Sequence, residues 1–372
     1  MRRASVVRFA MQRPSDVSHL DALVSHGVIS PTDIVAIVAK TEGNGSLTDY
    51  TVELAERSFR RWLSSILGQS GATVREAVTT IVEGGSEGVI SPHGLVIAVS
   101  DVDEVQPGGA RLAVGVARGE PVAPEEIGRR GLVVKVAEAV QRALDNAGLT
   151  HPEAVHGVLV LTPTLTLSEM QGLEEHAEAL VSATPEMLAA TSRRMAAIGV
   201  ASVLKEADPA ILDQHSPVAV DDITSSRAIV IAQPATRPQV LVFGNSETWC
   251  GPLAAAHAEM ADALDAEAIR SALGALGFAT DRPLQASETE RVMTCFAKAE
   301  ADPASRIRNR RHVMLEDADI HHTRHIRTVV GTVVAAMIGH PQVFVSAGAE
   351  AQGPSGGGSI CVIGHLTTAE RD

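Results

Sequence analysis

Aromatic residues are scarce in this chain, making up 2% of its 372 residues. Proteins that bind single-stranded nucleic acid stack the bases on aromatic side chains, and proteins that bind a phosphate backbone need an excess of lysine and arginine. The formal net charge here is −14. Both properties argue against a nucleic acid partner.

Long apolar runs and paired cysteines are lacking too. No apolar run reaches the roughly 18 residues of a membrane span, and the first residues lack the apolar segment of a signal peptide. We therefore expect no membrane partner and a cytoplasmic location. The three cysteines are odd in number and widely spaced, which predicts buried free thiols at Cys250, Cys295 and Cys361.

Fourteen histidines raise the question of a metal site. His321, His322 and His325 can share one helix face, but no acidic residue stands beside them at the spacing of a zinc protease motif. The sequence therefore gives little support for zinc.

The chain does contain three copies of one pattern. Each copy has apolar residues at helical spacing, a glycine suited to end a helix, and a short apolar run typical of a buried strand. The glycines are Gly27, Gly148 and Gly277, and the runs are Asp33–Lys40, Val155–Thr162 and Arg291–Lys298. Lys40 lies thirteen residues after Gly27. The position at the same distance from Gly148 is Leu161.

A second helical stretch and two further strands follow each run. The expected helices are Tyr50–Leu67, Glu186–Glu206 and His325–Ile338. The fold class predicted is α+β, with three similar α/β repeats around a pseudo-threefold axis and one central cavity. The expected repeat units are residues 1–104, 112–248 and 254–372.

Several segments closely resemble the cyanuric acid hydrolase and barbiturase family of ring-opening amidohydrolases. In the last third these are Phe296–Pro303, Arg308–His312, His322–His325 and Val345–Gly358. The first third agrees through Lys40–Gly45 and Gly84–His93, and the middle third through Ser192, Arg193 and Val242–Ser246. The resemblance covers essentially the whole chain.

This resemblance implies that each repeat offers a lysine, a serine and an arginine to the central cavity, where a small cyclic amide or imide binds and one ring amide is hydrolysed. A serine becomes a good nucleophile when a neutral lysine beside it acts as base. The substrate-binding positions implied are Lys40, Glu83, Gly84, Arg193, Arg324, Arg327 and Ala347. A homo-oligomer, a tetramer, and no organic cofactor are implied as well.

The chain departs from the family pattern in two repeats. In the second, the lysine is replaced by Leu161 and the serine position falls near Ile229 or Val230. In the first, the serine is replaced by Glu83 and the arginine by Val52. Two interpretations of the apolar replacements are open. Either this half of the cavity has become ordinary core, or the cavity is an asymmetric pocket with one apolar wall, lined by Val52, Leu161, Ile229 and Val230.

The third repeat is nearly whole, with Lys298, Ser346 and an arginine at Arg327 or Arg324. We expect Ser346 to be the nucleophile or a hydroxyl that orients water, and Lys298 to be its base. The alternative is that both only bind a substrate carbonyl. For Glu83 the alternatives are an ion pair with Lys40, or a carboxylate that positions water or fixes a cationic substrate.

A structural divalent cation, Mg²⁺ or Ca²⁺, is also implied by the resemblance. Its ligands would be the Glu300 carboxylate and the carbonyl oxygens near Ala349, Gln352, Gly353, Pro354 and Gly357. One carboxylate with several carbonyl oxygens suits such an ion. The expected function is a hydrolase that opens a cyclic amide, and the alternative is a non-hydrolytic binding protein or pseudoenzyme of the same fold.

Overall fold

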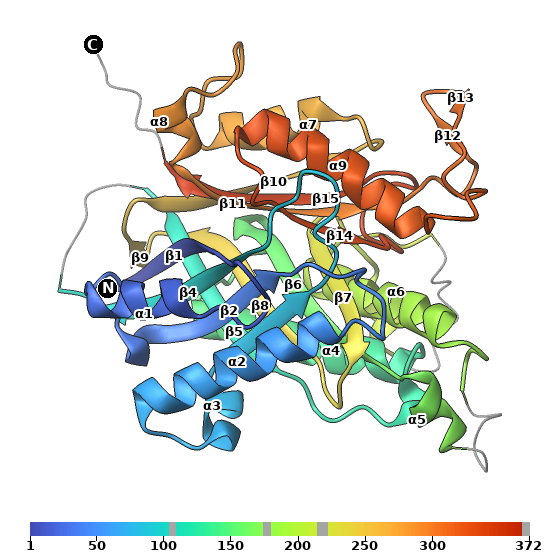
Figure 1. Cartoon of the computed structure of the whole chain (residues 1–372), viewed down its shortest axis with the longest axis horizontal. Helices are drawn as coiled ribbons and strands as arrows, with labels where there is room; N and C mark the ends of the chain where they lie inside the picture. The colour runs from blue at the N-terminus through green and yellow to red at the C-terminus, as the bar shows by residue number, and fades with distance from the viewer. Residues whose placement is uncertain (104–108, 174–179, 214–221, 367–372) are drawn as a thin grey trace.

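The computed structural model describes residues 1–103, 109–173, 180–213 and 222–366, which form three main sheets with helices packed against them (Figure 1). The strands of each main sheet, apart from the short added β9, come from one of the three expected units, although β5 and β10 each begin one residue before the expected bounds. Within the described residues, no helix combines the length and the apolar character needed to cross a bilayer.

The first unit runs from strand to helix and back. Its elements are β1 (Arg2–Ala10), α1 (Ser18–Ser25), β2 (Ile34–Lys40), α2 (Tyr50–Leu67), α3 (Gly71–Ala77), β3 (Thr79–Glu83) and β4 (His93–Asp101). The second unit has β5 (Arg111–Arg118), α4 (Arg130–Ala147), β6 (Val155–Thr164), α5 (Leu167–Gln171), α6 (Pro185–Val203), β7 (Ala228–Pro234) and β8 (Gln239–Ser246).

The third unit repeats this succession after the short strand β9 (Trp249–Cys250). It has β10 (Leu253–Met260), α7 (Ala266–Ala275), α8 (Ala286–Thr289), β11 (Val292–Ala299), β12 (Arg306–Ile307), β13 (Arg310–Arg311), α9 (His322–Ile338), β14 (Phe344–Ala347) and β15 (Gly358–His365). Short 3₁₀ turns lie at Pro31–Asp33, Pro124–Glu126, Pro152–Ala154 and Pro209–Leu212.

All three sheets have the same strand order. The orders are β3-β2-β4-β1, with β9 added beyond β1, then β7-β6-β8-β5, and then β14-β11-β15-β10. In each sheet the two strands joined through the second helix are parallel, and the other pairings between the four main strands are antiparallel. The predicted class, three similar α/β repeats, is confirmed.

The glycines that were expected to end helices adopt backbone conformations that favour glycine. Gly27, Gly148 and Gly277 have φ values of 69°, 69° and 80°. A side chain is rarely accommodated in this left-handed region, so a glycine there stops the helix and redirects the chain toward the next strand.

Each sheet has an inner and an outer face. In β2, Ala36 and Val38 belong to a central core shared by the three sheets, whereas Ile37 and Ala39 pack outward in a cluster with Phe59. Successive strand residues point to opposite faces, so Lys40 continues the inner series of Ala36 and Val38. The same alternation places Lys298, Glu83 and Ser346 on inner faces, after Phe296, Ile81 and Phe344.

Candidate active site

The strand pairing identifies which residues are equivalent in the three repeats. Lys40 pairs with Glu83 in the first sheet, and Lys298 pairs with Ser346 in the third. In the second sheet Leu161 pairs with Ile231. The serine position of the second repeat is therefore Ile231, and the prediction of Ile229 or Val230 is wrong by one or two residues.

Four side chains of the first and third repeats form a continuous buried hydrogen-bonded chain. Lys298 Nζ donates to Ser346 Oγ at 2.7 Å, and Ser346 Oγ donates to Glu83 Oε1 at 2.9 Å. Lys40 Nζ donates to Glu83 Oε2 at 3.1 Å. Of the two hypotheses for Glu83, the ion pair with Lys40 is present. We call Lys40, Glu83, Lys298 and Ser346 the polar floor.

Burial weakens the proton affinity of both lysines. It lowers the pKa of Lys298 to about 7 against the opposing effect of the Glu83 carboxylate, and Arg193 lowers this pKa further. Burial also lowers the pKa of Lys40 to about 8, while Glu83 raises it. Because its pKa is the lower of the two, Lys298 is the lysine better able to accept a proton near neutral pH. Its Nζ also donates to the carbonyl oxygens of Val230 and Ala347, at 2.8 and 3.2 Å.

A cavity of about 440 Å³ adjoins the polar floor. Among the sequence-predicted residues, those that line it are Val52, Glu83, Gly84, Arg193, Arg327 and Ala347, and Ile231 lines it as well. Lys40, Lys298 and Ser346 are fully buried, so Glu83 is the member of the floor that faces the cavity.

Four further predicted positions do not line this cavity. Leu161 lines a neighbouring hollow, and Ile229 and Val230 are buried in the core. The Arg324 side chain is 45% exposed and lies 3.3 Å from Glu87. Of the four positions expected to form an apolar lining, Val52 alone does so, because the inner face of β7 presents Ile231 instead.

Two arginines form bidentate ion pairs across repeat boundaries. Arg327 of α9 binds Glu87, which follows β3, through Nε and one terminal nitrogen at 2.6 and 2.7 Å. Arg193 of α6 binds Glu350, which follows β14, at 2.7 and 2.6 Å. Burial alone would raise the pKa of Glu350, but the Arg193 guanidinium holds it below its usual value. We call these two pairs the boundary clamps.

A glycine makes room for each clamp. A Cβ atom at Gly85 would lie 2.7 Å from Arg327 Cζ, and one at Gly348 would lie 2.6 Å from Arg193 Nε. Both glycines stand two residues after the floor residue of their strand, Glu83 or Ser346. At the third boundary the matching residue is Gln233, whose side-chain nitrogen donates to the carbonyl oxygen of Val82.

The clamp glutamates also follow one spacing. Glu87 stands four residues after Glu83, and Glu350 four residues after Ser346. The residue four after Ile231 is Ala235. Glu87, Glu350 and Ile231 were not predicted from the sequence, although the repeated order of floor residue, glycine and glutamate is a signal that could have revealed the first two.

The predicted carbonyl ligands belong to a curled segment after β14, and Glu300 directly follows β11. Glu300 accepts a hydrogen bond from the Gly356 backbone, and burial, followed by Glu350, raises its pKa. Ala351, Gly353 and Gly356 have positive φ values of 58°, 103° and 78°, which curl the chain and its carbonyls. A half-buried carboxylate beside carbonyl oxygens is a donor set that fits Mg²⁺ or Ca²⁺.

The histidines expected to share a helix face lie beside different carboxylates. His325 Nε2 lies 3.0 Å from Asp317, whereas His321 Nε2 lies 3.0 Å from Glu186 of α6. In the described part of the chain, Glu186, His321 and His322 form a group whose donor atoms lie within 4.8 Å of one another.

All three cysteines are free and buried, as predicted.

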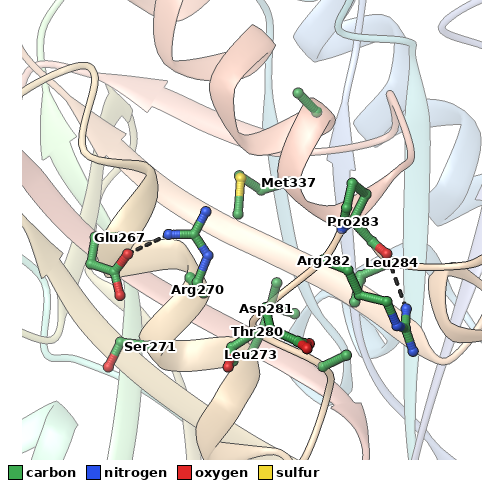
Figure 2. Close-up of a pocket in the computed structure, with 12 residues that line it drawn as sticks. Glu267, Arg270, Ser271, Leu273, Thr280, Asp281, Arg282, Pro283, Leu284 and Met337 are labelled. Atoms are coloured by element: carbon green, nitrogen blue, oxygen red, sulfur yellow. Dashed lines mark hydrogen bonds and ion pairs between the residues drawn. The ribbon is translucent and has the colours of Figure 1, made fainter.

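A larger hollow of about 720 Å³ lies between α7 and the end of α9. Figure 2 shows its lining, with Arg270 directed toward Glu267 and Arg282 toward the Pro283 carbonyl. None of the sequence-predicted site residues lines it. The smaller cavity above the polar floor is therefore the candidate active site.

Comparison with known proteins gives concordant results. The family described as "Amidohydrolase ring-opening protein" matches residues 5–365. A cyanuric acid amidohydrolase of Enterobacter cloacae is 39% identical over 97% of this chain and 99% of its own length, and a cyclic amide hydrolase of Azorhizobium caulinodans is 36% identical over 97% and 99%. A solved cyanuric acid hydrolase has a TM-score of 0.92 at 37% identity, covering 98% of this chain and 100% of that one. These relatives favour the hydrolase over the binding-protein alternative.

Proposed function

Because the chain belongs to the ring-opening amidohydrolase family, and so hydrolyses a C–N bond of a cyclic amide, we propose that it opens a cyclic imide bound above the polar floor. The observation that carries this proposal is the 2.7 Å hydrogen bond between Lys298 and Ser346, next to a cavity lined by two arginines.

Ser346 is the nucleophile in this proposal. Its Oγ forms a bond to a ring carbonyl carbon, and its proton passes to neutral Lys298 Nζ. The lysine then gives this proton to the ring nitrogen as the C–N bond breaks. Water cleaves the resulting ester, which releases the opened product and restores the Ser346 hydroxyl. Because Ser346 is fully buried behind Glu83, the Glu83 carboxylate must move aside when the carbonyl approaches.

Lys40 has a different role from Lys298. It is bound to the Glu83 carboxylate, an interaction that favours its protonated form, so it fixes Glu83 and does not act as a base. Arg193 and Arg327 each use two nitrogens for a clamp, and a guanidinium has five N–H donors. The remaining donors can bind ring carbonyls and stabilise the charge that develops on oxygen during attack.

We also propose that a divalent cation, Mg²⁺ or Ca²⁺, is held by Glu300 and by the carbonyl oxygens near Ala349, Gln352, Gly353, Pro354 and Gly357. Its chemistry would be structural: it would neutralise Glu300 and brace the segment that carries Glu350. No organic cofactor is needed for the steps above. The proposal further includes a homo-oligomer, a tetramer, located in the cytoplasm, where free buried cysteines persist.

The test is a ring-opening assay. Purified enzyme is incubated with cyanuric acid, barbiturate, and smaller imides and lactams, and the opened products are quantified by chromatography. We expect at least one ring to be opened and Lys298→Ala to lose this activity. Turnover that Lys298→Ala leaves intact would rule out Lys298 as the base.

A further inference from the structure

One of the three repeat boundaries has lost every polar element that the other two keep. Where the first and second repeats meet, Val52 stands at the arginine position and Ala235 at the glutamate position. Leu161 and Ile231 replace the lysine and its partner, and both are at least 95% buried. Gln233 occupies the position of the glycine that a clamp requires, so a guanidinium could not stack there as it does over Gly85 and Gly348.

These replacements are consistent with one another. An arginine, glutamate or lysine left alone in such a place would be a buried charge without a partner, which is strongly destabilising. Here no such charge remains among the five positions. Val52, Ile231, Ala232 and Pro234 form an apolar patch of the cavity lining at this boundary, and Gln233, Glu53 and Glu56 line the cavity beside it. The cavity thus has an arginine-glutamate clamp at two boundaries and, in place of a clamp, this apolar patch at the third.

The cations of the clamps and Lys40 are paired with carboxylates without a ligand, and the further carboxylates Asp49, Glu53 and Glu56 line the cavity as well. Lys40, Arg193 and Arg327 are matched by Glu83, Glu350 and Glu87, in contacts of 2.6 to 3.1 Å. Glu83 adds a negative charge at a position where the third repeat has the neutral hydroxyl of Ser346. An anionic ring would approach this carboxylate and be repelled, whereas a neutral ring could donate an N–H group to it.

We propose, on the basis of the function proposed above, that the substrate is a neutral cyclic dicarboximide: a five- or six-membered ring with one CO–NH–CO unit and a hydrocarbon edge. The two carbonyls bind the arginines of the two boundary clamps, a ring N–H donates to Glu83, and the hydrocarbon edge lies on the apolar wall.

The geometry of such a ring agrees with the arrangement of the repeats. In a six-membered imide the two carbonyls point one third of a turn apart, as do neighbouring repeats around a threefold axis. A third carbonyl, as in a symmetric triazine trione, would point at the wall of Val52 and Ile231 and lose its hydrogen bonds with water without replacement. A cavity of about 440 Å³ has room for an apolar substituent on the hydrocarbon edge.

The experiment compares kcat/KM for glutarimide and succinimide with kcat/KM for cyanuric acid and barbiturate, using the full-length enzyme. We expect at least a tenfold preference for a dicarboximide. Val52→Arg, which puts a guanidinium on the apolar wall, should shift this ratio toward cyanuric acid by at least tenfold. Val28→Arg is the matched control, because Val28 is 55% exposed and belongs to the same repeat; it should leave the ratio unchanged.

Glu83→Gln provides a second variant in case Val52→Arg does not fold. Removing the carboxylate should improve the relative binding of barbiturate, an acidic ring, by at least fivefold in calorimetric titrations. Equal or better turnover of cyanuric acid by the wild type, or an unchanged ratio in both variants, would overturn the inference and leave the proposed function standing. Turnover of none of these rings would count against the proposed function, and against this inference with it.

Discussion

Glu83 Oε1 accepts a hydrogen bond from Ser346 Oγ at 2.9 Å, and this contact joins the first repeat to the third. The same carboxylate binds Lys40 through its other oxygen. Glu83 therefore connects Lys40, whose pKa burial lowers to about 8, to the serine whose own lysine has a pKa lowered further, to about 7. Two repeats supply this group of four, while the matching residues of the second repeat, Leu161 and Ile231, are apolar.

The first prediction concerns the pH dependence of turnover. Lys298 must be neutral to accept a proton, and burial lowers its pKa to about 7, so the rate should rise as the pH increases through about 7. The Glu83 carboxylate raises this pKa. Glu83→Gln should therefore move the midpoint of the pH–rate profile to lower pH.

The control for this shift is Glu267→Gln. The Glu267 side chain is 74% exposed and lies outside the cavity, so its removal should leave the midpoint where it is. A midpoint that stays fixed or moves to higher pH in Glu83→Gln would contradict the assignment of Lys298 as the titrating base.

The second prediction concerns the clamp between Arg327 and Glu87. Both side chains are less than 10% exposed, and Arg327→Met would leave the buried Glu87 carboxylate without its bidentate partner and with the longer 3.3 Å contact to Arg324. We expect a loss of about 3–5 kcal/mol in the free energy of unfolding, measured by urea denaturation. Adding Glu87→Gln to this variant should recover part of the loss, because the buried charge that lost its bidentate partner is then removed.

Arg57→Met is the comparison for that measurement. Arg57 pairs with Glu53 on the surface of α2, where both side chains are more than half exposed. Such pairs contribute little, so the change should stay within about 1 kcal/mol. Similar losses for Arg57→Met and Arg327→Met would show that the boundary clamp contributes no more to the free energy of unfolding than a surface ion pair.

Part of this architecture could be predicted from the sequence, and the omissions have physical reasons. The glycine-ended helices and the strands after them were found because Gly27, Gly148 and Gly277 mark each helix end. The first strand of each repeat was not predicted. Leu253–Met260 is rich in alanine, a residue with high helix propensity, and becomes β10 through its pairing with β15.

The register of the second repeat was missed for another reason. In β7 the residues Ala228–Ile231 are all buried and apolar, so no alternation shows which of them faces the cavity. The pairing of Ile231 with Leu161 supplies this information. The clamps were missed because each joins residues of two different repeats, as in Arg193 with Glu350, and local patterns do not report such contacts.

The third prediction concerns the proposed cation. Treatment with a chelator should lower the thermal unfolding temperature, and added Mg²⁺ or Ca²⁺ should restore it, because a bound ion stabilises the folded state. Glu300→Gln should unfold at a lower temperature before treatment and should no longer respond to the chelator. An unfolding temperature that does not respond to the chelator in the wild type would refute the site.

In the proposed reaction, Ser346 performs the attack on the ring. The most direct test is the ring-opening rate of Ser346→Ala relative to the wild type, on the ring that the wild type opens fastest, with Ser25→Ala as an exposed serine control. We expect a loss of at least about 10³-fold in kcat for Ser346→Ala, an unchanged rate for Ser25→Ala, and folded protein in both cases by thermal unfolding. A folded Ser346→Ala enzyme that keeps its rate within tenfold of the wild type would contradict this assignment.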